Sequence, residues 1–151
     1  MKKLHMIPSF FIAHTYYWGD VHRKQLGKRA YAISPARTAL GLDLPYTFHQ
    51  DTPVLPPDML RTVQCAVTRS TETGAVLGRE ECISPLEALR GVTVNAAYQY
   101  FEEKEKGSIQ VGKRADLVVL SANPLKVPAN EIGKIEVLVT IKEGSVQYRK
   151  A

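Results

Sequence analysis

The stretch "PYTFHQDTPV", residues 45–54, places two chemically active side chains at the end of an apolar segment. Residues 46–48 favour a short strand, and His49, one spacer and Asp51 follow before Pro53. Proline cannot donate a hydrogen bond to a strand ladder, so it ends the strand and lets the chain turn. Because side chains two residues apart lie on one face of a strand, the sequence predicts that His49 and Asp51 share a face.

The length and composition favour one ordinary domain, or one domain and a fragment of another, because the chain has 151 residues. Hydrophobic residues make up 44% and charged residues 23%, which is typical of a soluble globular protein. The net charge of +5 comes from short basic stretches mixed with acids, so we expect no nucleic-acid partner. No apolar run is long enough to span a bilayer, so we expect no membrane partner.

The first twenty residues have two lysines before an apolar stretch, as a secretory signal would. His5 and Pro8 interrupt that stretch, and no small-residue cleavage site follows, so we predict no signal peptide and a cytoplasmic protein. Cys65 and Cys82 are too few for a disulfide framework and lie in no metal-ligand spacing. They are interpreted as two buried thiols in a reducing compartment.

Residues 1–106 have the pattern of strands and helices that is typical of an α/β protein. The apolar run "IPSFFIA", residues 7–13, is typical of a buried strand in a parallel sheet. Helices are predicted within residues 34–44, 56–71 and 84–101. In the first of these helices Ser34 is the expected N-cap, and in the last one Ser84 and Glu87 have the spacing of a capping box.

Residues 107–151 are rich in strands and glycine turns. "ADLVVL", residues 115–120, is a compact strand, and residues 134–149 alternate around a Glu-Gly turn as a hairpin does. We expect Gly112 and Gly144 to lie in turns and Asp116 to have a structural role. A charge introduced at Val119 is expected to unfold residues 107–151. One apolar face is expected to contain Ile109, Val111, Leu117, Val119, Val137, Val139 and Ile141.

Four segments in order resemble the C-terminal end of the amidohydrolase superfamily. They are "IPSFFIAHTYYWGD" (7–20), "HQDTPV" (49–54), "ISPLEALRGVTVNAA" (83–97) and "GSIQVGKRADLVVL" (107–120), which is followed by "VLVTIKEGSVQY" (137–148). The first segment resembles the amidohydrolase family 3 branch that includes N-substituted formamide deformylase-like proteins. The resemblance implies an α/β fold class, with the last strands and helices of a TIM barrel in residues 1–106. Residues 107–151 would then form part of a small β-sandwich.

The resemblance also implies roles for individual residues. Asp51 matches the aspartate of the last barrel strand, which binds the metal and accepts a proton from water. His14 would contact the substrate, and the cofactor of the complete enzyme would be a divalent metal, with zinc expected first. From the residues themselves, His49 shares a face with Asp51 and could position the substrate or orient the aspartate, and Trp18 could wall an apolar substrate pocket. From the residues alone, Asp51 could instead be a turn or capping aspartate, His14 a hydrogen-bonded strand end, and Trp18 a packing residue.

Other polar residues receive structural interpretations. Asp20 and His22, in "WGDVH", are not expected to bind metal, because the ligands of the family lie elsewhere. Arg69 could meet a substrate anion, but a surface salt bridge is the favoured interpretation. The family's His-x-His and its other metal ligands are missing from this sequence, and a full barrel needs about 250 residues.

Three accounts of the function therefore stay open. The chain could be a fragment of a metal-dependent hydrolase acting on carbon–nitrogen bonds of a small-molecule substrate, inactive alone. It could be a non-catalytic module that self-associates, or a regulatory protein that uses the sheet for binding. We expect a homo-oligomer, or association with a missing N-terminal half.

Overall fold

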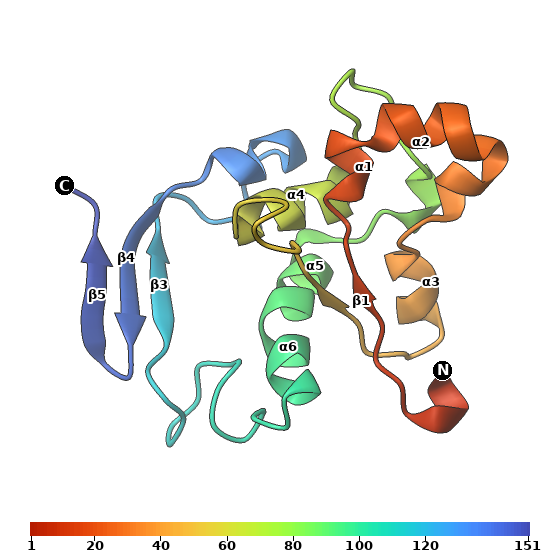
Figure 1. Cartoon of the computed structure of the whole chain (residues 1–151). Coiled ribbons are helices and arrows are strands. Elements are labelled where there is room, and N and C mark those ends of the chain that lie inside the picture. Colours follow the sequence, from red (N-terminus) through yellow and green to blue (C-terminus); the bar gives the residue numbers. More distant parts are fainter.

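The computed structural model describes residues 1–151 and shows mixed α/β architecture with two small sheets. A three-stranded sheet lies at one end, helices α4 and α5 lie in the middle, and a two-stranded sheet with α1–α3 lies at the other end (Figure 1). The helices are α1 (His14–Tyr17), α2 (Gly19–Leu26), α3 (Ala36–Gly41), α4 (Met59–Thr68), α5 (Pro85–Val92) and α6 (Val94–Gln99). The strands are β1 (Ser9–Phe10), β2 (Thr47–Phe48), β3 (Leu117–Leu120), β4 (Val137–Lys142) and β5 (Ser145–Arg149). Short 3-10 turns cover Lys2–Leu4, Gly27–Ala32, Arg79–Glu81 and Ala129–Lys134. No helix is both long enough and apolar enough to cross a membrane.

The two N-terminal strands pair in parallel, as the sequence predicts, but they are shorter than expected. Ser9 faces Thr47 and Phe10 faces Phe48. The predicted strand over residues 7–13 is wrong beyond Phe10, because the chain turns there and enters α1 at His14. The apolar residues that follow β1 are still buried, since Ile12 and Ala13 lie in the core.

The helix starts depend on local hydrogen bonds. Asp58 caps α4, and its carboxylate accepts from the Arg61 N–H at 2.9 Å. The predicted capping box is confirmed, because the Ser84 hydroxyl accepts from Glu87 N and the Glu87 carboxylate accepts from Ser84 N at 2.7 Å. The helix predicted over 84–101 is interrupted at Thr93 and becomes α5 and α6.

Ser34 does not cap α3, so this prediction is wrong. The residue before α3 is Pro35, and Ser34 has a left-handed backbone with φ of 47°. Instead, the Ser34 carbonyl accepts from the guanidinium of Arg69 at 3.1 Å. Arg69 is fully buried and also donates to the carbonyls of Ile33 and Leu77, at 2.8 and 2.6 Å. The expectation of a surface salt bridge is wrong as well, because Arg69 ties three backbone segments together inside the protein.

The main core lies between the parallel strands and helices α3–α5. Gly91 of α5 lies against the Phe48 ring, where a Cβ atom would lie 2.8 Å from that ring, so glycine allows the close approach. Cys65 is buried and Cys82 is half-buried, and both thiols are free. The buried cluster contains Ile12, Ala36, Ala39, Tyr46, Phe48, Val63, Cys65, Ala66, Ile83, Ala88 and Ile132.

The C-terminal sheet is antiparallel in the order β3–β4–β5, so β3 and β5 are its edges. The hairpin is confirmed: Glu143 and Gly144 have φ of 50° and 79° between β4 and β5. Such positive φ values suit a tight hairpin turn. Asp116 accepts from the Glu143 N–H at 2.8 Å, which supports the structural role expected for it. Gly112 also has a positive φ, of 90°, in a turn.

The predicted single apolar face is wrong for part of its members. Ile109 and Val111 lie in the loop before β3 and are 89% and 107% exposed. Val119 pairs with Val139 but is 45% exposed. Alternation in the sequence therefore predicted the strand but overstated its burial, because no second layer covers this part of the sheet.

Candidate functional site

His49 and Asp51 lie just beyond β2, at the end where the two parallel strands stop. The Nδ1 atom of His49 forms a hydrogen bond with the Oγ atom of Ser9 in β1, at 2.8 Å. The Nε2 atom of His49 lies 3.6 Å from Asp51 Oδ1. Because β2 ends at Phe48, strand alternation does not account for this pairing. The left-handed backbone of Asp51, with φ of 50°, bends the chain there.

Gln50, between these two residues, fixes the turn from inside. It is buried, and its Nε2 donates to the Asp58 carbonyl at 2.8 Å and to the Thr62 hydroxyl. Thus the residue between His49 and Asp51 is tied to the start of α4. The Asp51 side chain is 59% exposed, which leaves its carboxylate accessible to a ligand.

His14 and Trp18 lie in the same neighbourhood, around the ring of Phe11. The Phe11 ring centre is 4.2 Å from that of His14 and 5.3 Å from that of His49. The Trp18 ring lies 5.2 Å from His14. The structure therefore gathers three of the four predicted site residues around Phe11, and the His49–Asp51 contact adds the fourth.

The electrostatics of His14 reflect this grouping. Partial burial lowers the pKa of His14, and the nearby His22 and His49 lower it further, while Asp51 acts in the opposite direction. His14 is therefore mainly neutral at neutral pH. A neutral imidazole can donate from one ring nitrogen and accept, or bind a metal, at the other.

Sequence reasoning missed Ser9, Phe11 and His22 as members of this neighbourhood. Ser9 and Phe11 belong to an apolar run whose strand character hid them, and Ser9 contacts a residue forty positions away. The Nε2 atom of His22 lies 3.3 Å from the Nδ1 atom of His14. Its eight-residue spacing from His14 would have been a usable signal only if the break between α1 and α2 had been known.

Asp20, by contrast, has a structural role, because its carboxylate is hydrogen-bonded within the protein. Its carboxylate accepts from the hydroxyls of Thr71 and Thr73, at 3.0 and 2.9 Å. Although burial favours its neutral form, these hydrogen bonds lower the pKa of Asp20 overall. They join α2 to the loop after α4.

The fit to a metal is partial. No group of three or more His, Cys, Asp or Glu side chains is arranged so that it could hold a metal ion. A carboxylate is a suitable ligand for a divalent metal, but a catalytic zinc uses about three protein ligands. Asp51 could supply one ligand, and the others would have to come from outside these residues.

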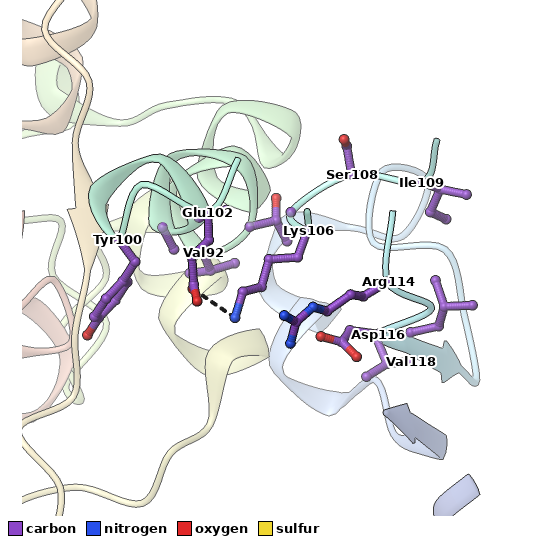
Figure 2. A pocket seen from close by; sticks show the side chains of 14 residues that line it. Val92, Tyr100, Glu102, Lys106, Ser108, Ile109, Arg114, Asp116 and Val118 are labelled. Carbon is purple, nitrogen blue, oxygen red and sulfur yellow. Dashed lines mark ion pairs between the residues drawn. The ribbon is translucent and has the colours of Figure 1, made fainter. Parts of the chain in front are cut away.

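Two larger cavities lie away from Asp51, between the helices and the C-terminal sheet. One, of about 660 Å³, is lined by α6, the segment after it and the start of β3. Figure 2 shows its charged side, where Glu102 and Lys106 form an ion pair at 2.8 Å and Arg114 and Asp116 line the wall. The other, of about 730 Å³, is mainly apolar and separates α4 and α5 from β3 and β4. Both cavities show that the sheet packs incompletely on the helices.

Comparisons with known proteins identify the family of this chain. A family model described as "Amidohydrolase family" matches residues 1–148. The N-substituted formamide deformylase of Arthrobacter pascens is 31% identical over 135 residues, which are 88% of this chain and 25% of that protein.

Solved structures show the same fold. A metal-dependent hydrolase from Pyrococcus horikoshii superposes with a TM-score of 0.70 at 22% identity, over 85% of this chain and 27% of that one. One from Pyrococcus furiosus gives 0.66 at 24% identity, over 83% and 25%. The chain thus spans about a quarter of the length of these relatives. Since the family model covers nearly every residue, the chain belongs to the amidohydrolase family.

Proposed function

We propose that this chain forms the C-terminal part of a metal-dependent hydrolase that cleaves a non-peptide, amide-type carbon–nitrogen bond in a small molecule. The observation that carries the proposal is the position of Asp51, beside His49 and near His14, where two parallel strands end. In a barrel of parallel strands, that end is the active-site mouth. Residues 1–106 would belong to the barrel and residues 107–151 to the small β-sandwich.

Asp51 is the proposed proton carrier of the reaction. A divalent metal, with zinc the first candidate, would polarise the amide and make the attacking water more acidic. Asp51 would bind that metal through one oxygen, accept the proton of the water, and deliver it to the leaving nitrogen. Its exposed carboxylate is accessible for both steps.

His49 orients this carboxylate. If the Ser9 hydroxyl donates to Nδ1, the imidazole proton lies on Nε2, which faces Asp51 Oδ1. His14 and Trp18, on the neighbouring α1 segment, would contact the substrate beside the reacting bond. Positioning of this kind affects substrate affinity more than the chemical step.

The remaining ligands and strands would come from a missing N-terminal half, and the chain alone is proposed to be inactive. The second candidate function, a self-associating module without catalysis, is favoured by one observation. All five residues of the edge strand β5 are exposed, including Val146 and Tyr148 at 51% and 49%. Unpaired edge strands tend to pair with another chain.

A chimera tests the catalytic proposal. This chain would replace the matching quarter of the Arthrobacter pascens deformylase, and turnover of an N-substituted formamide would be measured with and without added Zn²⁺. Asp51→Asn keeps the size of the side chain but removes the base, and should reduce kcat by about 10²–10⁴-fold. His14→Ala should mainly raise KM.

Asp43→Asn is the matched control, because Asp43 is an exposed aspartate that pairs only with Lys2 at 3.5 Å. It should leave turnover unchanged. Full turnover of Asp51→Asn, together with loss of turnover in His49→Ala or Asp20→Asn, would show that the catalytic carboxylate is placed wrongly. A folded, metal-loaded chimera without hydrolysis would contradict the function itself.

A further inference from the structure

His14 and His22 form a close pair of imidazoles at the junction of α1 and α2. His14 begins α1, and His22 lies on α2 after the break at Trp18. His14 Nδ1 and His22 Nε2 are 3.3 Å apart, and the ring centres are 5.2 Å apart with the planes inclined by 32°. No other hydrogen-bond partner occupies either of these two nitrogens.

The pair is held by a rigid support. Gly19, at the start of α2, lies so close to Thr71 that a Cβ atom there would be 2.6 Å from the threonine methyl group. Asp20, in the next position, is fixed by the hydroxyls of Thr71 and Thr73. The position of His22 is therefore set by contacts with the loop after α4, and not by the imidazole contact itself.

The two nitrogens are at hydrogen-bond distance in this structure, and their spacing also fits a shared metal ion. N–H···O hydrogen bonds span about 2.7–3.2 Å, and a fully linear N–H···N contact at the observed separation would place the ring centres ~5.6 Å apart. Two imidazoles on a tetrahedral zinc, with Zn–N bonds of about 2.0–2.1 Å, have nitrogens ~3.3–3.4 Å apart and ring centres ~5.1–5.3 Å apart. Both observed distances, 3.3 and 5.2 Å, agree with the second arrangement.

The chemistry of the groups agrees with this geometry. Imidazole is a preferred ligand for zinc, copper and nickel, and it binds in its neutral form. In either tautomer, a neutral imidazole keeps one ring nitrogen with a free lone pair that can bind a metal. The negative charge of Asp51 is close enough to act on His14 and favours a cation nearby.

We propose that His14 Nδ1 and His22 Nε2 are the two protein ligands of a divalent transition-metal site, with water completing the coordination. Asp51 is not a third ligand, because no group of three such side chains converges in the structure. The site is therefore distinct from the metal that Asp51 would help to bind, and it does not depend on the proposed hydrolase function. A bound metal would fix the position of α1 relative to α2, close to Asp51.

Zinc titration of the tag-free chain tests the site. After metal removal with a chelator, isothermal calorimetry with Zn²⁺ should show one bound equivalent in the wild type. His14→Gln and His22→Gln should each weaken binding by more than ~10-fold, since even changes outside the ligand shell cost 10–100-fold. Histidine ¹⁵N spectra should show zinc-dependent shifts at His14 Nδ1 and His22 Nε2.

Two control variants separate this site from other binding. His5→Gln removes an exposed histidine elsewhere and should keep the wild-type affinity. Asp51→Asn removes only a nearby charge and should weaken binding less than either ligand variant does. The proposal is overturned if the wild type binds no zinc, if His22→Gln binds as tightly as the wild type, or if only Asp51→Asn loses binding. His22 is only half-buried on α2, so we expect His22→Gln to fold. This variant therefore still tests the proposal if His14→Gln does not fold.

Discussion

The two parts of the chain, residues 1–106 and 107–151, differ in how completely they bury their apolar residues. The first part has a core of fully buried side chains around α4 and α5. In the second part only Ile132 and Ile135 are buried, and both lie outside the strands. The C-terminal sheet leaves Val118, Val119 and other apolar residues more than 40% exposed. The difference teaches that the hairpin sequence fixes the shape of this sheet, while its burial requires a packing partner.

The sharpest way to break this comparison is to place a charge in each part. Val63 of α4 is fully buried, so Val63→Asp should destabilise the protein by several kcal/mol, because a buried unpaired charge is costly. Val119→Asp, at a 45% exposed position, should cost less than about 1 kcal/mol. Urea unfolding of the two variants measures the difference. Equal losses would show that the sheet is as buried as the helical core.

The contact between the parts gives the next largest effect. Ile132 reaches the helical core from the 3-10 turn Ala129–Lys134, and the Gly133 N–H donates to Gln64 of α4 at 2.7 Å. Ile132→Ala should cost about 2–5 kcal/mol through the cavity it leaves. Ile109→Ala, which removes the same atoms from an 89% exposed side chain, should change stability by no more than about 0.5 kcal/mol. Similar urea midpoints for both variants would refute the role of Ile132 as an anchor.

How far the sequence could predict this molecule depended on how local each feature is. The Ser84–Glu87 capping box and the Glu143–Gly144 turn were predictable because neighbouring residues determine them. The lengths of β1 and β2 were not, because a parallel strand depends on partners far along the chain. The burial of Val119 was overestimated for the same reason.

The candidate site shows the same division. Family resemblance assigned Asp51 and His14 to the site, and the residue pattern added His49 and Trp18. The structure brings these four side chains together. The Ser9–His49 and His14–His22 contacts could not be read from spacing. The first joins residues from different strands, and the second crosses the break between α1 and α2.

The smallest expected effect concerns the alkaline stability of the first part. Burial, and then the charge of Glu87, raise the pKa of Tyr46 to about 12 from 10.0. The folded state therefore keeps this phenol protonated, and its contribution is complete below pH 10.0 and is lost as the pH rises towards 12. Between about pH 9 and about pH 11 the wild type should lose about 1 kcal/mol more than Tyr46→Phe.

Urea midpoints at the two pH values check this prediction. Tyr98→Phe is the control, because Tyr98 is 46% exposed on α6, and it should retain the wild-type alkaline loss. An alkaline loss in Tyr46→Phe equal to that of the wild type would show that Tyr46 does not titrate in this way.

The central claim is that the chain contains a complete helical core but incomplete sheets, and therefore associates with itself or with a missing half. Light scattering of the purified chain at micromolar concentration tests it most directly. The account predicts a molar mass above that of the monomer, or a broad distribution, because β5 and the two-stranded sheet have unpaired edges. A sharp monomeric mass with cooperative melting would contradict it.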